Sequence, residues 1–372
     1  QNTMLLGAST VSVLVVVAAY LAFLLQQKPI VRDSHFSDDE FVWPPRGSVY
    51  RSRRVADDLV MKMVEAGPPN AKQVIIFLHG FPQTSSMWDG YVQHFAEKGY
   101  RVLAPDMRGF NESIPSTRKV KRELTMDLFA EDIKGIVKAH NRLGQKVILV
   151  SHDWGSAAAW KFVLKYPYLT RAFVAMSVPH PSLYRIHNLV NLPWSLRHVW
   201  YFFFLGAATP LGLWKAERDD WAWLTWYFLY DSEPLTFSKK EVRALKEVWR
   251  KSMTSMIAVY RMGIKWFATS LLPWLDDNVW HPSKQPSTVP TLQMFGHRDA
   301  YVDPAMAGAS MHPDYVTFSL SRTHVYQASH WLPDEKRALC IRHIEQFLDS
   351  LPPELPSAFT DEDKDEAFYM GD

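Results

Sequence analysis

Short apolar segments alternate with helical segments along the chain after residue 55. The apolar segments span residues 74–78, 102–105, 147–150, 173–177, 291–295, 316–320 and 324–327. Segments that are apolar almost throughout are typical of strands buried on both faces, as in a parallel sheet covered by helices on each side. The pattern predicts an α/β fold built on a mostly parallel sheet.

The alternation stops between residues 186 and 286, where the pattern is helical and rich in tryptophan. Ten of the 15 Trp residues of the chain fall in this interval. We interpret the interval as a helical lid inserted between two halves of one α/β domain, residues 55–185 and 287–351. Aromatic side chains line apolar pockets as readily as they fill cores, so the lid is also a candidate pocket wall.

The N-terminal segment 4–25 has 22 residues and no charge. A helix of that length crosses a hydrocarbon core of about 30 Å, so we expect a membrane anchor. A cleaved signal peptide is the alternative, but its apolar region is usually shorter and ends at a small-x-small site. The basic residues Lys28, Arg32 and Arg46 favour a cytosolic position for the C-terminal side of this segment. We therefore expect a single-pass membrane protein, with the endoplasmic reticulum as its location.

Polar segments flank the predicted domain. Residues 26–54 contain several acidic residues and the break Trp43-Pro44-Pro45, as a linker does. Residues 352–372 begin with two prolines and continue into an acidic run, which is typical of a solvated tail.

Net charge, cysteine content and missing motifs argue against several classes of function. The chain has 41 Lys and Arg against 39 Asp and Glu, a net charge of +2 that gives no argument for a nucleic-acid partner. Its single cysteine, Cys340, excludes an internal disulfide and any Cys-rich metal site. Neither H-E-x-x-H nor a phosphate-binding glycine loop is present, so we expect no metal and no cofactor.

The segment V-I-L-V-S-H-D-W-G-S, residues 147–156, carries the strongest chemical signal. An apolar run leads into small-x-Asp-x-small and then into an alanine-rich helix, the context of a nucleophile elbow. Asp153 stands at its centre, where the helix dipole keeps a carboxylate ionised and ready to act as a nucleophile without a base. The alternative is an ordinary N-cap aspartate.

The segment His79-Gly80-Phe81-Pro82 also ends an apolar run. Where an elbow presents a nucleophile, a loop after another strand supplies one backbone N–H to an oxyanion hole, and the residue after the nucleophile supplies the second. The candidates are Phe81 and Trp154. A plain turn after the strand is the other interpretation, because Gly and Pro mark turns in many contexts.

Two later segments provide an acid and then a histidine. In proteins with a nucleophile elbow, the nucleophile, the acid and the histidine follow one another along the chain in this order. Gly296-His297-Arg298-Asp299 follows the apolar run 291–295, and Ala328-Ser329-His330-Trp331 precedes the last predicted helix. We predict His330 as the base and Asp299 as the residue that orients it. Asp303 is a rival to Asp299, since it lies beyond the same strand.

Taken together, residues 48–351 resemble α/β-hydrolases of the soluble epoxide hydrolase type and their membrane-anchored relatives. The resemblance rests on H-G-F-P (79–82), D-M-R-G-F (106–110), S-H-D-W-G (151–155), P-H-P (179–181), G-H-R-D (296–299) and S-H-W-L (329–332). The family usually has Gly where Ser151 stands. The resemblance implies two lid tyrosines that hold the epoxide oxygen, and the matching segments carry Tyr227, with Tyr230 as competitor, and Tyr260. We interpret Asp106 and Arg108 as a structural ion pair.

These residues lead to a functional hypothesis. We expect hydrolysis of an apolar, lipid-like epoxide by water to a vicinal diol, through an ester on Asp153 that His330 helps water to cleave. Haloalkane dehalogenation is an alternative with the same first step, although Phe81 stands where dehalogenases commonly carry Asn or Glu. A non-catalytic membrane-anchored relative is a third possibility. The sequence leaves the particular epoxide, the regioselectivity and the oligomeric state open.

Overall fold

The computed structural model describes residues 31–116, 124–140, 146–191, 198, 200–207, 209–271, 286–318 and 321–353. The predicted anchor at residues 4–25 and most of the predicted tail lie outside these residues. Among the helices that the structure describes, none is both long enough and apolar enough to cross a membrane.

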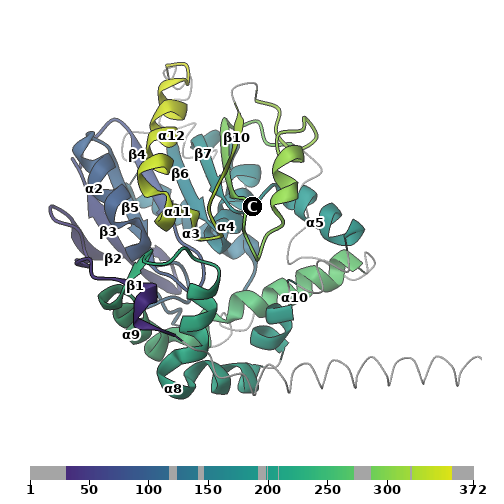
Figure 1. Cartoon of the computed structure of the whole chain (residues 1–372). Helices are drawn as coiled ribbons and strands as arrows, with labels where there is room; N and C mark the ends of the chain where they lie inside the picture. Colours follow the sequence, from purple (N-terminus) through teal and green to yellow (C-terminus); the bar gives the residue numbers. More distant parts are fainter. Residues whose placement is uncertain are drawn as a thin grey trace, which may run out of the picture.

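An eight-stranded sheet forms the centre of the molecule, in the order β10-β9-β7-β6-β4-β5-β3-β2 (Figure 1). Six neighbouring strands, from β10 to β5, run parallel, and β3 and β2 each run antiparallel to the preceding strand. The strands are β2 (Val49–Ala56), β3 (Leu59–Ala66), β4 (Val74–Leu78), β5 (Arg101–Pro105), β6 (Val147–His152), β7 (Thr170–Met176), β9 (Thr291–Gly296) and β10 (Arg322–Tyr326). The predicted mostly parallel sheet is confirmed.

Two details of the sheet differ from the prediction. The sheet begins at Val49, so the predicted boundary between linker and domain at residues 54 and 55 falls inside β2. This edge strand alternates exposed and half-buried positions and contains three arginines, so it presents no apolar run to detect. The predicted strand at 316–320 forms a single β-bridge, between Val316 and Ser287, and its residues 319 and 320 lie outside the described residues.

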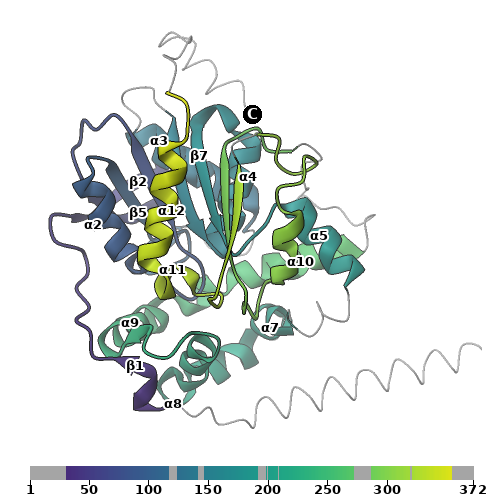
Figure 2. The same ribbon diagram turned by 45° about the horizontal axis from the view of Figure 1, so that its top comes forward.

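Helices cover both faces of the sheet. On one face α3 (Met126–His140) packs against α4 (Trp154–Lys165), and on the other α2 (Asp89–Glu97) packs against α12 (Arg337–Asp349), which follows the short α11 (Leu332–Glu335) (Figure 2). Neighbouring residues of one strand serve opposite faces: Ile76 joins the core on the α3 and α4 side, and Phe77 joins the core on the α2 and α12 side. This alternation explains why the central strands are apolar at every position.

Between β7 and β9 the chain forms a helical insertion that runs from α5 to α10. It comprises α5 (Pro181–Val190), α7 (Trp200–Phe202), a π-helical turn η4 (Phe203–Ala207), α8 (Thr209–Tyr230), a two-residue strand β8 (Phe237–Ser238), α9 (Lys239–Met256) and α10 (Ala258–Leu271). Helix α8 is broken at Arg218–Trp221, where three successive residues have positive φ. Strand β8 pairs with β1 (Phe36–Ser37), which ties the insertion to the N-terminal part of the described chain.

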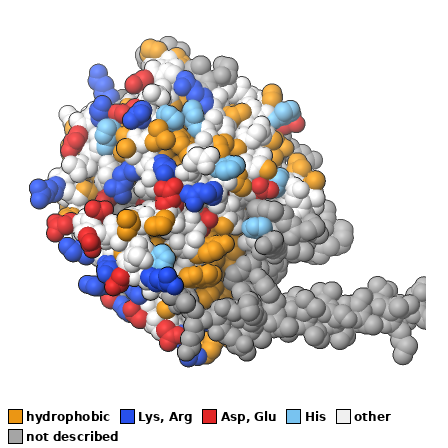
Figure 3. All heavy atoms as spheres, in the orientation of Figure 1, with side chains coloured by type: hydrophobic (Ala, Val, Ile, Leu, Met, Phe, Trp, Pro, Cys, Tyr) orange, Lys and Arg blue, Asp and Glu red, His pale blue; other side chains and the backbone are white. Residues whose placement is uncertain are grey.

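The remaining short helical turns are η1 (Asp33–His35), η2 (Ser85–Trp88), η3 (Pro167–Leu169) and η5 (Pro304–Ala309). In the face of Figure 3, positive and negative side chains are intermingled, as the net charge near zero leads one to expect. Hydrophobic side chains gather in the lower part of that face.

The interpretation of Asp106 and Arg108 as one ion pair is wrong. Arg108 is buried and pairs with Asp132 and Asp58, at 2.6 and 2.7 Å. Asp106 instead accepts the backbone N–H of Ser85 at 2.9 Å. It therefore fixes the start of η2, close to the His79-Gly80-Phe81-Pro82 loop, and not the arginine two residues away.

Candidate active site

Asp153 lies at the turn between β6 and α4, with a positive φ of 50° and ψ of −123°. A non-glycine residue rarely adopts this conformation, and the surrounding structure must enforce it. The turn leaves room only for small neighbours: a Cβ on Gly155 would lie 2.3 Å from the Leu78 carbonyl oxygen, and one on Gly80 would lie 2.4 Å from the Asp153 side chain. The predicted elbow is present, with Asp153 at its centre.

Ser151 is accommodated in this packing by hydrogen bonds. It is buried at the end of β6, where its hydroxyl donates to the Val174 carbonyl at 2.9 Å and lies 3.0 Å from the Ser156 hydroxyl. A hydroxyl held in this way points into the core and is satisfied there.

The Asp153 carboxylate lies between a backbone donor and a histidine. Its Oδ1 accepts the N–H of Phe81 at 2.9 Å, and its Oδ2 lies 3.5 Å from Nε2 of His330. The backbone N–H of Trp154 also interacts favourably with the ionised carboxylate. The two oxygens thus have different neighbours: Oδ1 accepts the N–H of Phe81, one of the two predicted oxyanion-hole donors, and Oδ2 faces the predicted base.

Asp299 holds the other side of His330. Its Oδ2 lies 2.8 Å from His330 Nδ1, and its Oδ1 accepts the N–H groups of Tyr301 and Val302, both at 2.8 Å. The rival Asp303 pairs instead with His187, at 2.7 Å. Of the two candidate acids, Asp299 is the one in contact with His330.

Burial and charge set the ionisation of the pair. Burial lowers the pKa of His330, but the charges of Asp299 and Asp153 and its hydrogen bonds to them outweigh burial and raise that pKa to about 10. Burial alone would raise the pKa of Asp153, yet the net shift is downward because His330, His152 and the Trp154 N–H favour the anion. At neutral pH the site therefore holds a carboxylate and an imidazolium.

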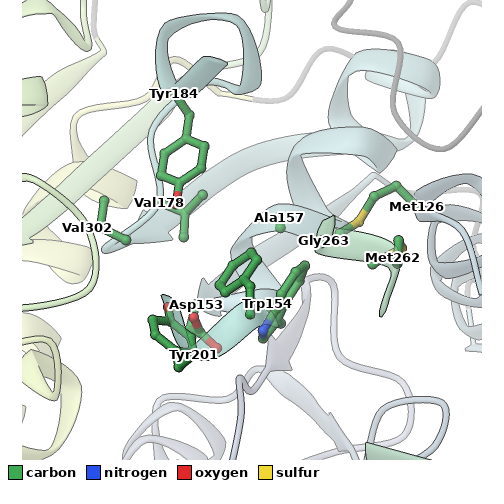
Figure 4. Close-up of a pocket in the computed structure, with 11 residues that line it drawn as sticks. Met126, Asp153, Trp154, Ala157, Val178, Tyr184, Tyr201, Met262, Gly263 and Val302 are labelled. Carbon is green, nitrogen blue, oxygen red and sulfur yellow. The ribbon is translucent and has the colours of Figure 1, made fainter. Parts of the chain in front are cut away.

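A pocket opens beside Asp153 (Figure 4). Apart from Asp153 its lining is apolar or aromatic, and Figure 4 shows Tyr201 next to Asp153 and Tyr184 reaching in from the opposite wall. The lining residues are Met126, Asp153, Trp154, Ala157, Val178, Tyr184, Tyr201, Phe202, Met262, Gly263 and Val302. Among the described residues no Lys or Arg lines this pocket.

The two tyrosines implied by the family resemblance occupy different positions. The Tyr260 ring packs edge-on against Phe81 and Trp154, with centroids 4.8 and 5.7 Å apart, and burial and then the charge of Asp153 raise the pKa of its hydroxyl. Tyr227 stacks on Trp223, and neither Tyr227 nor Tyr260 is among the residues that line the pocket. The Tyr227 hydroxyl is buried and makes no hydrogen bond to a described residue.

Sequence reasoning did not single out Tyr201. It lines the pocket beside Asp153, and its ring lies 5.6 Å from that of Tyr260 and 5.5 Å from that of Tyr227. The only available signal was its position in the aromatic run 200–204, which the sequence does not distinguish from the aromatic run around Tyr227.

A family model for the alpha/beta hydrolase fold matches residues 73–336, which contain every one of these side chains. The chain belongs to the alpha/beta hydrolase fold family. Within the part that the structure describes, no group of three or more His, Cys, Asp or Glu side chains is arranged to hold a metal ion.

Relatives in this family include named epoxide hydrolases. The chain is 27% identical over 285 residues to AB hydrolase superfamily protein YfhM of Bacillus subtilis, which is 74% of this chain and 90% of that protein. It is 27% identical over 284 residues to Epoxide hydrolase 1 of Caenorhabditis elegans, 74% of this chain and 65% of that protein. A crystal structure of a mutant epoxide hydrolase from Bacillus megaterium matches with a TM-score of 0.68 and 23% identity, over 81% of this chain and 100% of that one. The structural match supports the alpha/beta hydrolase fold.

Proposed function

We propose that this alpha/beta hydrolase converts an apolar epoxide and water to a vicinal diol. One observation carries the proposal: the elbow holds a carboxylate whose Oδ1 binds the Phe81 N–H and whose Oδ2 faces His330. An ionised carboxylate is a nucleophile in its own right, and the ester it forms must be cleaved at the carboxyl carbon. The names of the curated relatives support the choice of epoxide.

In the first step Asp153 Oδ2 attacks an epoxide carbon and the bond from that carbon to the ring oxygen breaks. The oxygen takes a proton from a tyrosine hydroxyl as its negative charge develops. We assign this task to Tyr201 and Tyr260. Burial raises the pKa of both phenols well above the usual value, so both are protonated donors at neutral pH. Tyr227, whose ring stacks on that of Trp223, is assigned a packing role.

The ester changes the ionisation of His330. Asp153 loses its charge when it is alkylated, and this charge is one of the contributions that raise the His330 pKa. The imidazolium then releases its proton, which restores the tyrosine, and neutral His330 takes a proton from the attacking water. The oxyanion that forms at Oδ1 is held by the N–H groups of Phe81 and Trp154. When the bond from the carboxyl carbon to the substrate oxygen breaks, that oxygen takes the proton carried by the water-derived carboxyl oxygen, which leaves the diol, ionised Asp153 and protonated His330.

The pocket favours a substrate that is apolar around the epoxide. Its lining offers tyrosine hydroxyls but, among the described residues, no cation for a carboxylate. We therefore propose a lipid epoxide whose charged end, if it has one, stays outside the described pocket. The helical insertion acts as the lid, and the apolar segment 4–25 anchors the chain in the endoplasmic reticulum membrane. Alkaline extraction of membranes tests the anchor.

The test measures diol formation by the 372-residue chain from an epoxy fatty acid and from its methyl ester, with Asp153→Ala as control. Diol from the wild type that is lost in Asp153→Ala supports the proposal, and a higher kcat/KM for the methyl ester supports the apolar substrate class. Halide release from haloalkanes without diol formation would show a dehalogenase. Neither product across a panel of epoxides and haloalkanes would favour a non-catalytic protein.

A further inference from the structure

We propose that Asp231, in the link between α8 and α9, is a positioning residue for His330. The link belongs to the helical insertion, whereas His330 belongs to the α/β core, so the insertion would supply part of the alignment of the base. This inference rests on the proposed function, because the step that it affects is the cleavage of the Asp153 ester.

The main chain of His330 is held from two sides. On the core side its carbonyl oxygen lies 2.9 Å from His152 Nε2 and accepts the Ser177 hydroxyl at 3.3 Å. On the insertion side its backbone N–H donates to Asp231 Oδ2 at 2.9 Å. The backbone N–H of Ala300, next to Asp299, also stabilises the ionised form of Asp231. One carboxylate from the insertion thus contacts the loops that carry both the base and its orienting acid.

A second residue of the same link, Glu233, also contacts these loops. Glu233 pairs with Arg298 at 2.8 Å and with Lys336 at 2.9 Å, and its N–H donates to Glu335 at 2.7 Å. Glu335 in turn accepts the backbone N–H of Ser329 at 2.8 Å. Figure 2 shows the link between α8 and α9 close to α11, where these contacts are made.

The Asp231 hydrogen bond and the Glu233 ion pairs differ in how strongly solvent weakens them. The Arg298 side chain is 49% exposed and that of Glu233 33%, so water and salt screen this pair. Asp231 is more enclosed: burial and then the charge of Asp299 raise its pKa to about 6. A partly buried carboxylate that accepts backbone donors makes stronger and more directional hydrogen bonds than an exposed ion pair. Asp231 is therefore the contact that fixes the angle of the His330 loop.

A displaced His330 affects the two chemical steps unequally. Ester formation needs the Asp153 carboxylate and the tyrosine donors, none of which Asp231 contacts in the described structure. Ester hydrolysis needs the imidazole aligned with the attacking water. Misplacement of a reacting group by about 1 Å can cost a factor of about 100 in rate, so we expect the loss in the second step.

The experiment follows single turnovers of one epoxide by the 372-residue chain, wild type against Asp231→Ala, with Asp231→Asn as the conservative variant. Intact-mass measurement of quenched samples gives the rate of ester formation, and diol appearance gives the rate of its hydrolysis. The matched control is Asp220→Asn, which alters an insertion carboxylate that pairs with Lys246 and Arg250.

For Asp231→Ala we expect ester formation within about threefold of wild type and hydrolysis slower by roughly 10- to 100-fold, so that ester accumulates. Asp231→Asn keeps one acceptor and should recover part of the loss, and Asp220→Asn should match the wild type. Wild-type hydrolysis rates in Asp231→Ala would overturn the inference. Equal slowing of both steps with a lowered melting temperature would overturn it too, because that is the result of a structural role. If the wild type forms neither ester nor diol, the proposed function itself fails.

Discussion

The edge of the sheet and the helical insertion position their candidate groups by different forces. At the sheet edge, hydrogen bonds of 2.8 to 2.9 Å join Asp299 to His330 and Phe81 to Asp153. In the insertion, Tyr201 and Tyr260 are placed by ring packing, with centroids 5.6 Å apart. Hydrogen bonds fix single atoms and set pKa values, whereas ring packing fixes the position of a whole side chain. In the mechanism that we propose, activation of water by the base therefore depends on the sheet, and proton donation to the epoxide oxygen depends on the insertion.

The largest expected effect comes from the sheet. Asp153→Ala removes the nucleophile and should lower kcat by about a thousandfold or more, on the order seen when the nucleophile of other hydrolases is removed. Diol formation under saturating epoxide measures it. Substantial residual turnover would mean that a group other than Asp153 attacks the epoxide. The sheet edge would then not supply the nucleophile.

The next effect separates the two steps at the sheet edge. His330→Gln leaves Asp153 free to form the ester but removes the base, so kcat should fall by about a thousandfold while ester accumulates. Intact-mass measurement after mixing with epoxide detects the added mass. A variant that turns over normally would exclude His330 from the mechanism.

A smaller effect tests the insertion. Tyr201→Phe and Tyr260→Phe each remove one donor to the developing charge and should each slow ester formation by roughly 10- to 100-fold. Tyr227→Phe is the matched control and should change the rate by less than about threefold, since Tyr227 neither lines the pocket, as Tyr201 does, nor packs against Phe81 and Trp154, as Tyr260 does. A larger loss in Tyr227→Phe than in Tyr201→Phe would reverse the assignment of the pair.

The smallest expected effect concerns the pH dependence of the stability that His330 contributes to the fold. The pKa of His330 is raised in the folded state to about 10 from an ordinary value of 6.5, so the imidazolium stabilises the fold fully below about pH 6.5. This contribution is lost as the pH rises towards 10. The difference in melting temperature between wild type and His330→Gln should therefore shrink between neutral pH and about pH 10. A constant difference would mean that the ion pair of the sheet edge does not form.

The structure brings together the candidate residues that the sequence places next to strand ends. Asp153, Phe81, Asp299 and His330 each follow a strand within a few residues, and the carboxyl ends of parallel strands meet at one edge. Strand position alone did not separate Asp299 from Asp303, since both follow β9. The separation depended on His187, which comes from α5 and pairs with Asp303.

Prediction was weaker in the insertion, where no strand order constrains the side chains. Helical periodicity tells which residues share a face, but not which face meets the pocket. Tyr227 and Tyr201 lie in similar aromatic runs, and the break of α8 at Arg218–Trp221 interrupts the periodicity that would relate one part of the helix to the other. The sequence pattern does not predict the contact that Asp231 of the insertion makes with the His330 loop.

By itself, the sequence determined the α/β architecture, the elbow with an aspartate at its centre, and the chain order of that aspartate, the candidate acid and the candidate base, because these depend on local apolar patterns and on residues next to strand ends. The tertiary structure decided which acid contacts the base, which tyrosine lies beside Asp153, and which insertion residue holds the histidine loop. Those choices depend on how segments far apart in the chain pack against one another, and such packing has no local signature in the sequence.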